Sequence, residues 1–300
     1  MNNKPTLAIG IAAYNEAQNI GALISAFLNQ KISSARFVEI VVVSDASTDG
    51  TDKIVQGFAD KNVRLIRLQE RSGLSKVQNK IMETIDTDIL FVSDADILPG
   101  DEYHIENLIA PILKDAKVGL TSSALVPISP KTFIEKVLVR NHEWKVGLFS
   151  SIGNGDNIYN CGGPSRSFSK ALYKKLRYPD NCPNDAFSYL FCIEQGLKFK
   201  YAPKARAIFR CPAVFKDHLK QSVRYITGKR AIINIFGDLA KKAYEFPRGL
   251  FLRMLLIEFI SHPILFLSYI LMSIITNLKA RKSKFNSRWD IAASSKIVKI

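Results

Sequence analysis

The chain has 300 residues, of which 47% are hydrophobic and 23% are charged, and this composition excludes disordered and collagen-like chains. Its formal net charge of +15 is uneven: residues 1–200 hold 23 Lys and Arg against 22 Asp and Glu, whereas residues 201–300 hold 19 against 5. Four cysteines without C-x-x-C spacing argue against a zinc ribbon, a thioredoxin-type site and a secreted disulfide framework. The basic last third predicts an anionic partner, which could be a nucleic acid, a phosphate-bearing ligand or a membrane surface.

The first hundred residues alternate between strand and helix patterns. Residues 7–14 form a β-rich run, residues 38–45 a continuous apolar run, and residues 62–68 and 88–96 two further strand patterns. Helical spacing of apolar residues separates them, at positions 20–28 and again through Phe58. We therefore expect an α/β fold, with a mostly parallel sheet flanked by helices. The N-terminus lacks the apolar core of a signal peptide, so it is interpreted as the first strand.

Polar and acidic residues follow three of these strands. They occupy positions 13–16, 44–50 and 93–96. Ligands of such sheets bind beyond the carboxyl ends of the strands, so the three segments predict a single cleft. Asp45, at a strand terminus, is well placed to accept hydrogen bonds from a ligand, although an Asx-rich turn that caps the next helix is the simpler interpretation of residues 45–50.

Asp94 and Asp96 give the sharpest local signal. In an extended segment the side chains of residues i and i+2 point to the same side, which would pair the two carboxylates. Such a pair suits a hard divalent cation that also binds diphosphate oxygens. Two solvated or capping acids at a strand end are the alternative interpretation.

Several segments together resemble a known family. The segments AYNEAQNI, VVVSDASTDGT and FVSDADILPG resemble the nucleotide-sugar half of family 2 glycosyltransferases, which have the GT-A fold. CGGPSRSFSKALY resembles the family's glycine-rich acceptor-side segment, and NDAFSYLFCIEQGLKFKYAP resembles its E-D motif with the following helix and strand. Residues 221–225, with Gly228, resemble Q-x-x-R-W. The resemblance covers roughly residues 5–230.

The resemblance implies a role for each matching residue. It assigns binding of the nucleotide sugar to Ala13, Tyr14, Glu16, Asp45, Asp94, Gln221, Arg224 and Tyr225. Tyr14 would lie against the base and Asp45 would hold its edge. Asp96, with Asp94, would bind Mg²⁺ or Mn²⁺ on the diphosphate. Asp185 would be the catalytic base of an inverting displacement.

Three departures from the family pattern matter. The acidic neighbour of the proposed base is replaced by Asn184, and the tryptophan of Q-x-x-R-W is replaced by Tyr225. The sequence also has at most one or two apolar C-terminal segments, whereas processive polysaccharide synthases usually have several membrane helices. We therefore expect addition of a single sugar rather than extrusion of a polymer.

The C-terminal region predicts membrane contact. Residues 263–278 are uncharged, and residues 279–288 contain five Lys and Arg. This length is marginal for a bilayer span, and the flanking charge fits the positive-inside pattern and attraction to anionic lipids. Spanning the bilayer and lying flat on it both stay open, and a buried C-terminal helix is the alternative. We expect a glycosyltransferase domain at 1–240 and a membrane-associated helical region with a basic tail at 241–300, on the cytoplasmic face.

The leading hypothesis is a membrane-associated inverting hexosyltransferase. It would use a nucleotide-diphosphate sugar, most plausibly UDP-linked, to glycosylate a lipid-linked or surface-polysaccharide acceptor, with no nucleic-acid partner. A sugar-phosphate nucleotidyltransferase would need a glycine-rich basic loop after the first strand, which residues 12–20 lack. A basic binding module for nucleic acid is a weaker alternative, because the sequence has no RNP, zinc-finger or heptad signature.

Overall fold

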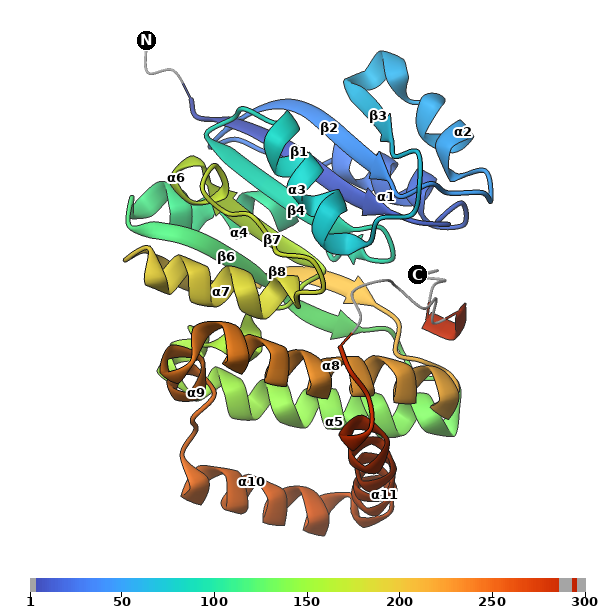
Figure 1. Cartoon of the computed structure of the whole chain (residues 1–300), viewed down its shortest axis with the longest axis vertical. Coiled ribbons are helices and arrows are strands. Elements are labelled where there is room, and N and C mark those ends of the chain that lie inside the picture. Colours follow the sequence, from blue (N-terminus) through green and yellow to red (C-terminus); the bar gives the residue numbers. More distant parts are fainter. Residues whose placement is uncertain (1–3, 286–292, 296–300) are drawn as a thin grey trace.

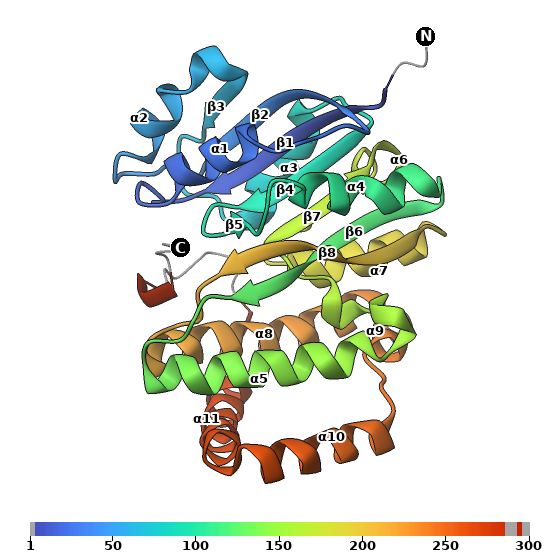
Figure 2. The same ribbon diagram turned by 180° about the vertical axis from the view of Figure 1, so that it is seen from behind.

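The structure is a computed structural model that describes residues 4–285 and 293–295. A mixed sheet with helices on both faces forms the upper part of Figure 1, and a base of long helices lies below it. The sheet has eight strands in the order β3-β2-β1-β4-β7-β6-β8-β5. Figure 2 shows the same arrangement from behind, with α1 and α4 on the face opposite α3 and α7.

The N-terminal half of the sheet is parallel, as the sequence predicts. The strands β1 and β4 pair side by side, with β2 on the other edge of β1 and β3 outside β2. Every residue of β1 except the first is buried, because helices cover both faces. The strands are β1 (Thr6–Ala13), β2 (Arg36–Ser44), β3 (Val63–Arg67) and β4 (Ile89–Asp94). The covering helices are α1 (Ile20–Leu28), α2 (Thr51–Gln56) and α3 (Leu74–Thr84).

The second half of the sheet mixes both strand directions. The strand β7 runs antiparallel to β4 and β6, whereas β8 runs parallel to β6. The strands are β5 (Leu98–Pro99), β6 (Val118–Pro127), β7 (Ser165–Ser169) and β8 (Lys198–Phe209). The helices of this half are α4 (His104–Lys114), α6 (Lys170–Tyr173) and α7 (Asn184–Glu194). The predicted α/β fold with a mixed, mostly parallel sheet is therefore confirmed.

Two sequence-based predictions were wrong in detail. The helical pattern was expected to continue through Phe58, but α2 ends at Gln56 and a separate 3₁₀ turn covers Ala59–Lys61. Residues 88–96 were expected to be one extended segment, but β4 ends at Asp94 and Asp96 lies in the turn that follows. The argument from strand alternation therefore does not apply to Asp96.

The helical base consists of α5 (Phe133–Ser150), α8 (Phe215–Phe236), α9 (Asp238–Ala243), α10 (Arg248–Ser261) and α11 (Pro263–Arg281). The buried residues of α11 recur every four positions, at Met272, Thr276 and Ala280. Met272 packs with buried residues of α5, and Arg230 on α8 donates a 3.0 Å hydrogen bond to the carbonyl oxygen of Ala280. α11 thus packs against α5 and α8 and crosses them at a steep angle (Figure 1).

The predicted division at residue 240 falls inside α9, and the division into two domains stays a prediction. The predicted basic tail lies partly outside the described residues, because 286–292 and 296–300 are not described.

Candidate active site

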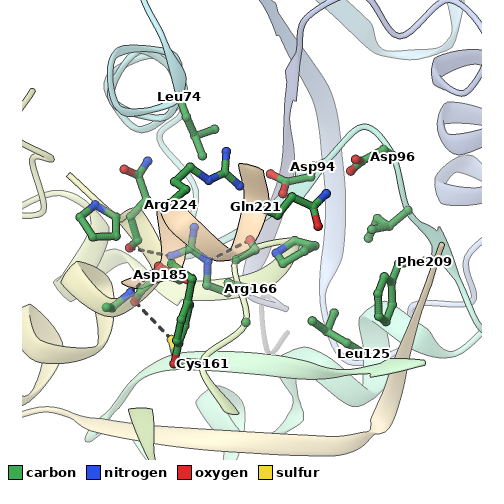
Figure 3. Close-up of a pocket in the computed structure, with 18 of the residues that line it drawn as sticks. Leu74, Asp94, Asp96, Leu125, Cys161, Arg166, Asp185, Phe209, Gln221 and Arg224 are labelled. Carbon is green, nitrogen blue, oxygen red and sulfur yellow. Dashed lines mark hydrogen bonds between the residues drawn. The ribbon is translucent and has the colours of Figure 1, made fainter. Parts of the chain in front are cut away.

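A cavity of about 460 Å³ lies beyond the carboxyl ends of β1 and β4, between the sheet and α8. Segments far apart in the sequence meet there. Its polar lining includes Tyr14, Glu16, Asp94, Asp96, Arg166, Asp185, Gln221, Arg224, Tyr225 and Lys229. Figure 3 shows Asp94 and Asp96 at one end, Asp185 beside Cys161 at the other, and Arg224 between them. Seven of the predicted binding and metal-ligating residues thus line the same cavity as Asp185, the proposed catalytic base.

The loop after β1 forms one wall of this cavity. Its backbone is held by the segment after β2, since the backbone N–H of Glu16 donates to the Thr51 hydroxyl at 2.8 Å. The buried Glu16 carboxylate accepts a 3.0 Å hydrogen bond from the side chain of Asn19. The guanidinium of Arg71 lies 4.1 Å from the ring centroid of Tyr14. Tyr14, which is predicted to lie against the nucleotide base, therefore has a cation stacked on one face of its ring.

Asp45 and Ala13 are placed differently from the other predicted contacts. Both are buried, and neither lines the cavity. The carboxylate of Asp45 accepts hydrogen bonds from the backbone N–H groups of Ser72 at 2.6 Å and Gly73 at 2.9 Å. Asp45 thus fixes the loop before α3, and its contact with a base stays a prediction.

Asp94 occupies the floor of the cavity. Its Oδ1 atom is buried and has no hydrogen-bond partner among the described residues. Burial raises the pKa of this carboxyl to about 7, and the negative charge of Asp96 adds to the rise, whereas Arg166 and Arg224 oppose it. A buried acid that faces a second acid is unfavourable without a bound cation.

The donor set at this end fits a hard divalent metal ion. The orphaned Asp94 oxygen and the adjacent Asp96 carboxylate could supply two oxygen ligands, and Mg²⁺ and Mn²⁺ sites commonly draw the rest from phosphates and water. No cluster of three or more His, Cys, Asp or Glu that could hold a metal occurs in residues 4–285 and 293–295. A metal at this site would therefore depend on the ligand's oxygens.

Arg166 links the walls of the cavity from below. It comes from β7, is fully buried and donates from Nη1 to the Asn184 carbonyl oxygen at 2.9 Å and to the Ser188 hydroxyl at 2.7 Å. Its Nη2 donates to Gln78 Oε1 at 3.2 Å, and its Nε to the Gly163 carbonyl oxygen at 3.2 Å. The guanidinium of Arg166 thus fixes α3, α7 and the glycine-rich segment before β7 relative to one another.

Asp185 lies in the first turn of α7. Its Oδ1 accepts a 2.8 Å hydrogen bond from the backbone N–H of Ala186, and its Oδ2 has no partner in the described part of the chain. The neighbouring Asn184 points inward instead: its Nδ2 donates to Gln78 Oε1 at 2.9 Å and its Oδ1 accepts from Ser75 at 2.9 Å. Asn184 therefore ties α7 to α3, where the family pattern has an acid.

Helix α8 closes the cavity opposite the sheet. Gln221, Arg224 and Tyr225 all line it, and Gln221 Nε2 donates to the Ser295 hydroxyl at 3.4 Å. Gly228 permits the close approach of Phe285, because an added Cβ would lie 3.1 Å from the Phe285 ring and 3.1 Å from Pro183. The segment after α11 thus contributes Phe285 and Ser295 to the cavity wall.

Several lining residues were not singled out from the sequence, among them Arg166, Lys229, Phe285 and Ser295. Arg166 lies within the segment SRSFS, which has no apolar alternation, so nothing in the sequence marks it as buried. Lys229 follows Gly228 of the recognised motif directly and could have been found there. Phe285 and Ser295 carry no signal in the sequence, because only the return of the chain after α11 brings them to the site.

Comparisons with known proteins agree with this architecture. Residues 8–177 match the model of glycosyl transferase family 2. Glycosyltransferase AglE of Haloferax volcanii is 30% identical over 101 residues, which are 33% of each chain, and the dolichyl-phosphate beta-glucosyltransferase of Drosophila melanogaster is 28% identical over 188 residues, 57% of this chain and 56% of the relative. This chain thus spans about half or less of these relatives.

A solved structure is similar over nearly the whole chain. The mannosyltransferase PcManGT from Pyrobaculum calidifontis, in complex with GDP-Man and Mn²⁺, has a TM-score of 0.67 at 17% identity, and the match covers 94% of this chain and 88% of that one. At this identity the likeness concerns the fold alone. The overall fold of this chain thus resembles that of a mannosyltransferase bound to GDP-Man and Mn²⁺.

Proposed function

The chain belongs to glycosyl transferase family 2, and on that premise we propose that it is an inverting glycosyltransferase that moves one sugar from a nucleotide-diphosphate sugar to an acceptor hydroxyl. One observation carries the proposal. The acidic pair Asp94 and Asp96 and the carboxylate of Asp185 lie at opposite ends of one cavity, with Arg224 between them (Figure 3). This arrangement suits a diphosphate at one end and an attacking hydroxyl at the other.

At the donor end, the charge of the departing diphosphate needs compensation. Bound Mg²⁺ or Mn²⁺, held by Asp94 and Asp96, would neutralise the developing charge on the diphosphate. Arg224 approaches Asp94 closely enough to oppose the rise in its pKa, so its guanidinium is positioned to bind diphosphate oxygens on the same side. Tyr14, with Arg71 stacked on one face, would lie against the base.

At the acceptor end, Asp185 would take the proton of the attacking hydroxyl. Its Oδ1 is held by the backbone of α7, which leaves Oδ2 to accept that proton as the new bond to C1 forms. Arg166 positions this carboxylate through the backbone of Asn184 and does not itself enter the cavity chemistry. Attack from the side opposite the diphosphate would invert the anomeric centre.

The proposal extends to the nucleotide and the acceptor. We propose a UDP-sugar donor and a lipid-linked or surface-polysaccharide acceptor. The name of the Drosophila relative supports a lipid-linked acceptor for that protein, and the apolar helices of this chain would bring its cavity close to such a substrate.

Helices α10 and α11 support contact with a membrane. Together they expose Leu252, Leu256, Ile257, Phe259, Ile260, Ile264, Leu267, Ile270, Leu271, Ile274, Ile275 and Leu278. So many exposed large apolar side chains on two consecutive helices are unusual for a protein surrounded by water. Lys279, Arg281, Lys282 and Lys284 follow at the end of α11, so these side chains are bordered by positive charge suited to anionic lipids on the cytoplasmic side.

We propose that α11 lies in the membrane interface rather than across the bilayer. Among the described helices, α11 alone is long and apolar enough to cross a bilayer by length and composition. One of its faces, however, packs against α5 and α8, and Lys145 of α5 donates to the Tyr269 hydroxyl at 2.8 Å. α10 and α11 run at a steep angle to each other along the base (Figure 1). Two such helices form a platform that fits the headgroup region.

Flotation with vesicles tests the platform. Replacing Leu256 and Leu271 with Gln should reduce binding to vesicles of anionic lipids about tenfold or more, because two large apolar side chains no longer enter the lipid. Leu113→Gln, at an exposed position on α4, is the control and should leave binding unchanged. Equal flotation of wild type, the double variant and the control would contradict the proposed contact of α10 and α11 with the membrane.

Thermal stability tests the catalytic proposal. The full chain in detergent is heated with UDP-, GDP-, dTDP- and CMP-linked sugars, each with Mn²⁺ or with EDTA. A ligand of the native state raises the melting temperature by mass action, so one nucleotide class should give a metal-dependent rise. If no sugar nucleotide shifts a folded, metal-supplied protein, the donor site is not functional and the proposal fails.

A further inference from the structure

Lys229 is a cation in the cavity that neither the family motif nor the proposed donor contacts use. It lies on α8, lines the cavity and is half-buried. No carboxylate of the described residues lies within ion-pair distance of its ammonium group. Its Nζ lies 4.4 Å from the ring centroid of Tyr244 instead. A partly desolvated cation with no counter-charge is unfavourable unless a ligand supplies one.

The position of Lys229 separates it from the donor end. It follows Arg224 by five residues, which places their Cα atoms about 7.5 Å apart along the helix axis. Arg224 acts on the charge of Asp94, whereas no acid is among the causes that shift the pKa of Lys229. The two cations of α8 therefore serve different parts of the cavity.

The aromatic partner of Lys229 places it on the side of the proposed base. Burial raises the pKa of the Tyr244 hydroxyl, and the charge of Asp185 contributes to the rise, so Tyr244 lies within electrostatic range of Asp185. The Tyr159 hydroxyl donates a 2.6 Å hydrogen bond to the Tyr244 carbonyl oxygen and fixes this wall. The Tyr244 ring, in turn, limits where the lysine stem can lie. Lys229 thus presents a positioned charge on the Tyr244 wall, which borders the acceptor end, while none of the causes that shift its pKa involves Asp185.

We propose that Lys229 binds a phosphate group of the acceptor, so that the acceptor is a phosphate-bearing alcohol rather than a neutral glycan. The proposal rests on the proposed function. Burial lowers the pKa of Lys229, and a bound phosphate would offset that cost. An ammonium group on a flexible stem binds phosphate as a point charge and donates up to three hydrogen bonds.

The transfer step balances without any further reactant. The acceptor oxygen forms its bond to C1 of the sugar as the bond from C1 to the diphosphate oxygen breaks, and the electron pair leaves with the nucleoside diphosphate. The hydroxyl proton passes to Asp185. The phosphate held by Lys229 takes no part in bond formation; it fixes the hydroxyl relative to C1.

The test compares phosphate-bearing and neutral probes in the presence of Mn²⁺ and the nucleoside diphosphate identified by the donor panel. The soluble pair is glycerol 3-phosphate and glycerol. The lipid pair is phosphatidylglycerol, which carries a phosphate and free hydroxyls, and diacylglycerol, which has a hydroxyl and no phosphate, both in detergent micelles so that the apolar helices α10 and α11 are covered in either case. Three variants of the full chain are compared with wild type: Lys229→Met, Lys229→Arg and, as the control on the same helix outside the cavity, Lys220→Met.

Wild type should bind one phosphate-bearing probe and neither neutral probe. Lys229→Met should weaken that binding about 10- to 100-fold, the loss of one charge-assisted contact, with donor affinity unchanged. Lys229→Arg should retain most of it, and Lys220→Met all of it. A response to phosphatidylglycerol alone identifies a lipid phosphate, and a response to glycerol 3-phosphate identifies a soluble one.

Two results would overturn the inference while the proposed function stands: a wild type that binds donor but no phosphate-bearing probe, or a Lys229→Met variant that binds the phosphate probe like wild type. Failure of the donor to bind wild type would instead refute the proposed function. In steady-state assays, Lys229→Met should raise the KM for the acceptor and leave the KM for the donor unchanged.

Discussion

Arg166 donates a 2.9 Å hydrogen bond to the carbonyl oxygen of Asn184, the residue that precedes the proposed base. Through this contact a fully buried cation on β7 sets the position at which α7 begins, and so the position of the Asp185 carboxylate. The same guanidinium reaches Gln78 on α3, which also accepts from the Asn184 side chain. The catalytic geometry therefore depends on a polar network beneath the cavity floor.

Arg166→Met should destabilise the protein by about 3 kcal/mol, because it leaves several buried acceptors without a donor. The free energy of unfolding in urea measures the loss. Arg36→Met, at an exposed arginine that begins β2, should change it by no more than about 0.5 kcal/mol. If the two variants are equally stable, the network does not carry the stability assigned to it.

Asp185→Asn should retain donor binding and lower the rate of transfer by about 10²- to 10⁴-fold, since only the acceptance of the proton is removed. The rate of sugar transfer and the dissociation constant of the donor are measured in parallel. Asp180→Asn replaces an exposed aspartate five residues earlier and should behave like wild type. Transfer near the wild-type rate in Asp185→Asn would show that another group is the base.

Metal binding should depend on pH through Asp94. Because its pKa lies at about 7 in the metal-free protein, the carboxyl is protonated at lower pH and a metal ion must displace that proton. The affinity for Mn²⁺ should rise with pH up to about 7 and then level off. Calorimetric titration with Mn²⁺ at several pH values, in the presence of the sugar nucleotide identified by the donor panel, measures this affinity. An affinity that does not change between about pH 5 and about pH 7 would contradict the assignment.

The Asp94 carboxyl should also make the stability of the metal-free protein depend on pH, but here a higher pH lowers the stability. A raised pKa means that the folded state holds more protons than the unfolded state between the ordinary value of 3.8 and about 7, so the contribution of Asp94 to stability is lost as pH rises through this window. Asp94→Asn should therefore raise the melting temperature in EDTA at pH 8 more than at pH 4. An equal change at both pH values would refute the raised pKa.

Gly228→Ala should weaken the contact between α8 and the segment after α11. The added Cβ would meet Phe285 and Pro183 at 3.1 Å, and such overpacking costs about 1–3 kcal/mol. Gly249→Ala on α10 is a matched control, because nothing lies within 4 Å of its added Cβ, and it should stabilise the helix by up to about 1 kcal/mol. Thermal unfolding distinguishes the two, and a neutral Gly228→Ala would show that Phe285 does not pack closely on α8.

The sequence predicts the first half of the fold well for a physical reason. Strands such as β1 and β2 are buried on both faces, so their residues form continuous apolar runs that stand out from the intervening helices. The strand β7 has the sequence SRSFS, and its first four residues are buried even though three of them are polar. No apolar pattern marks such a strand. It is buried because it pairs with β4 on one side and with β6 on the other.

The residues of the site can likewise be divided into those that the sequence predicts and those that it does not. Strand ends and family motifs lead to Tyr14, Asp94, Asp96 and Asp185, because these residues follow recognisable elements. The motifs do not reveal that Asp45 is engaged with the loop before α3. They also miss Phe285, because the chain returns to α8 only about 50 residues after this helix ends, and such a distant contact leaves no local sequence pattern.

Calorimetric titration of the sugar nucleotide identified by the donor panel, with Mn²⁺ or EDTA, tests the central claim most directly when wild type is compared with Asp96→Ala. Asp60→Ala, at an exposed position after α2, is the control. We expect wild type and the control to bind the sugar nucleotide with Mn²⁺ and not with EDTA. Asp96→Ala should not bind it in either case, because the diphosphate is held through a metal on this carboxylate. Equal affinity in EDTA, or an Asp96→Ala protein that binds like wild type, would contradict the central claim.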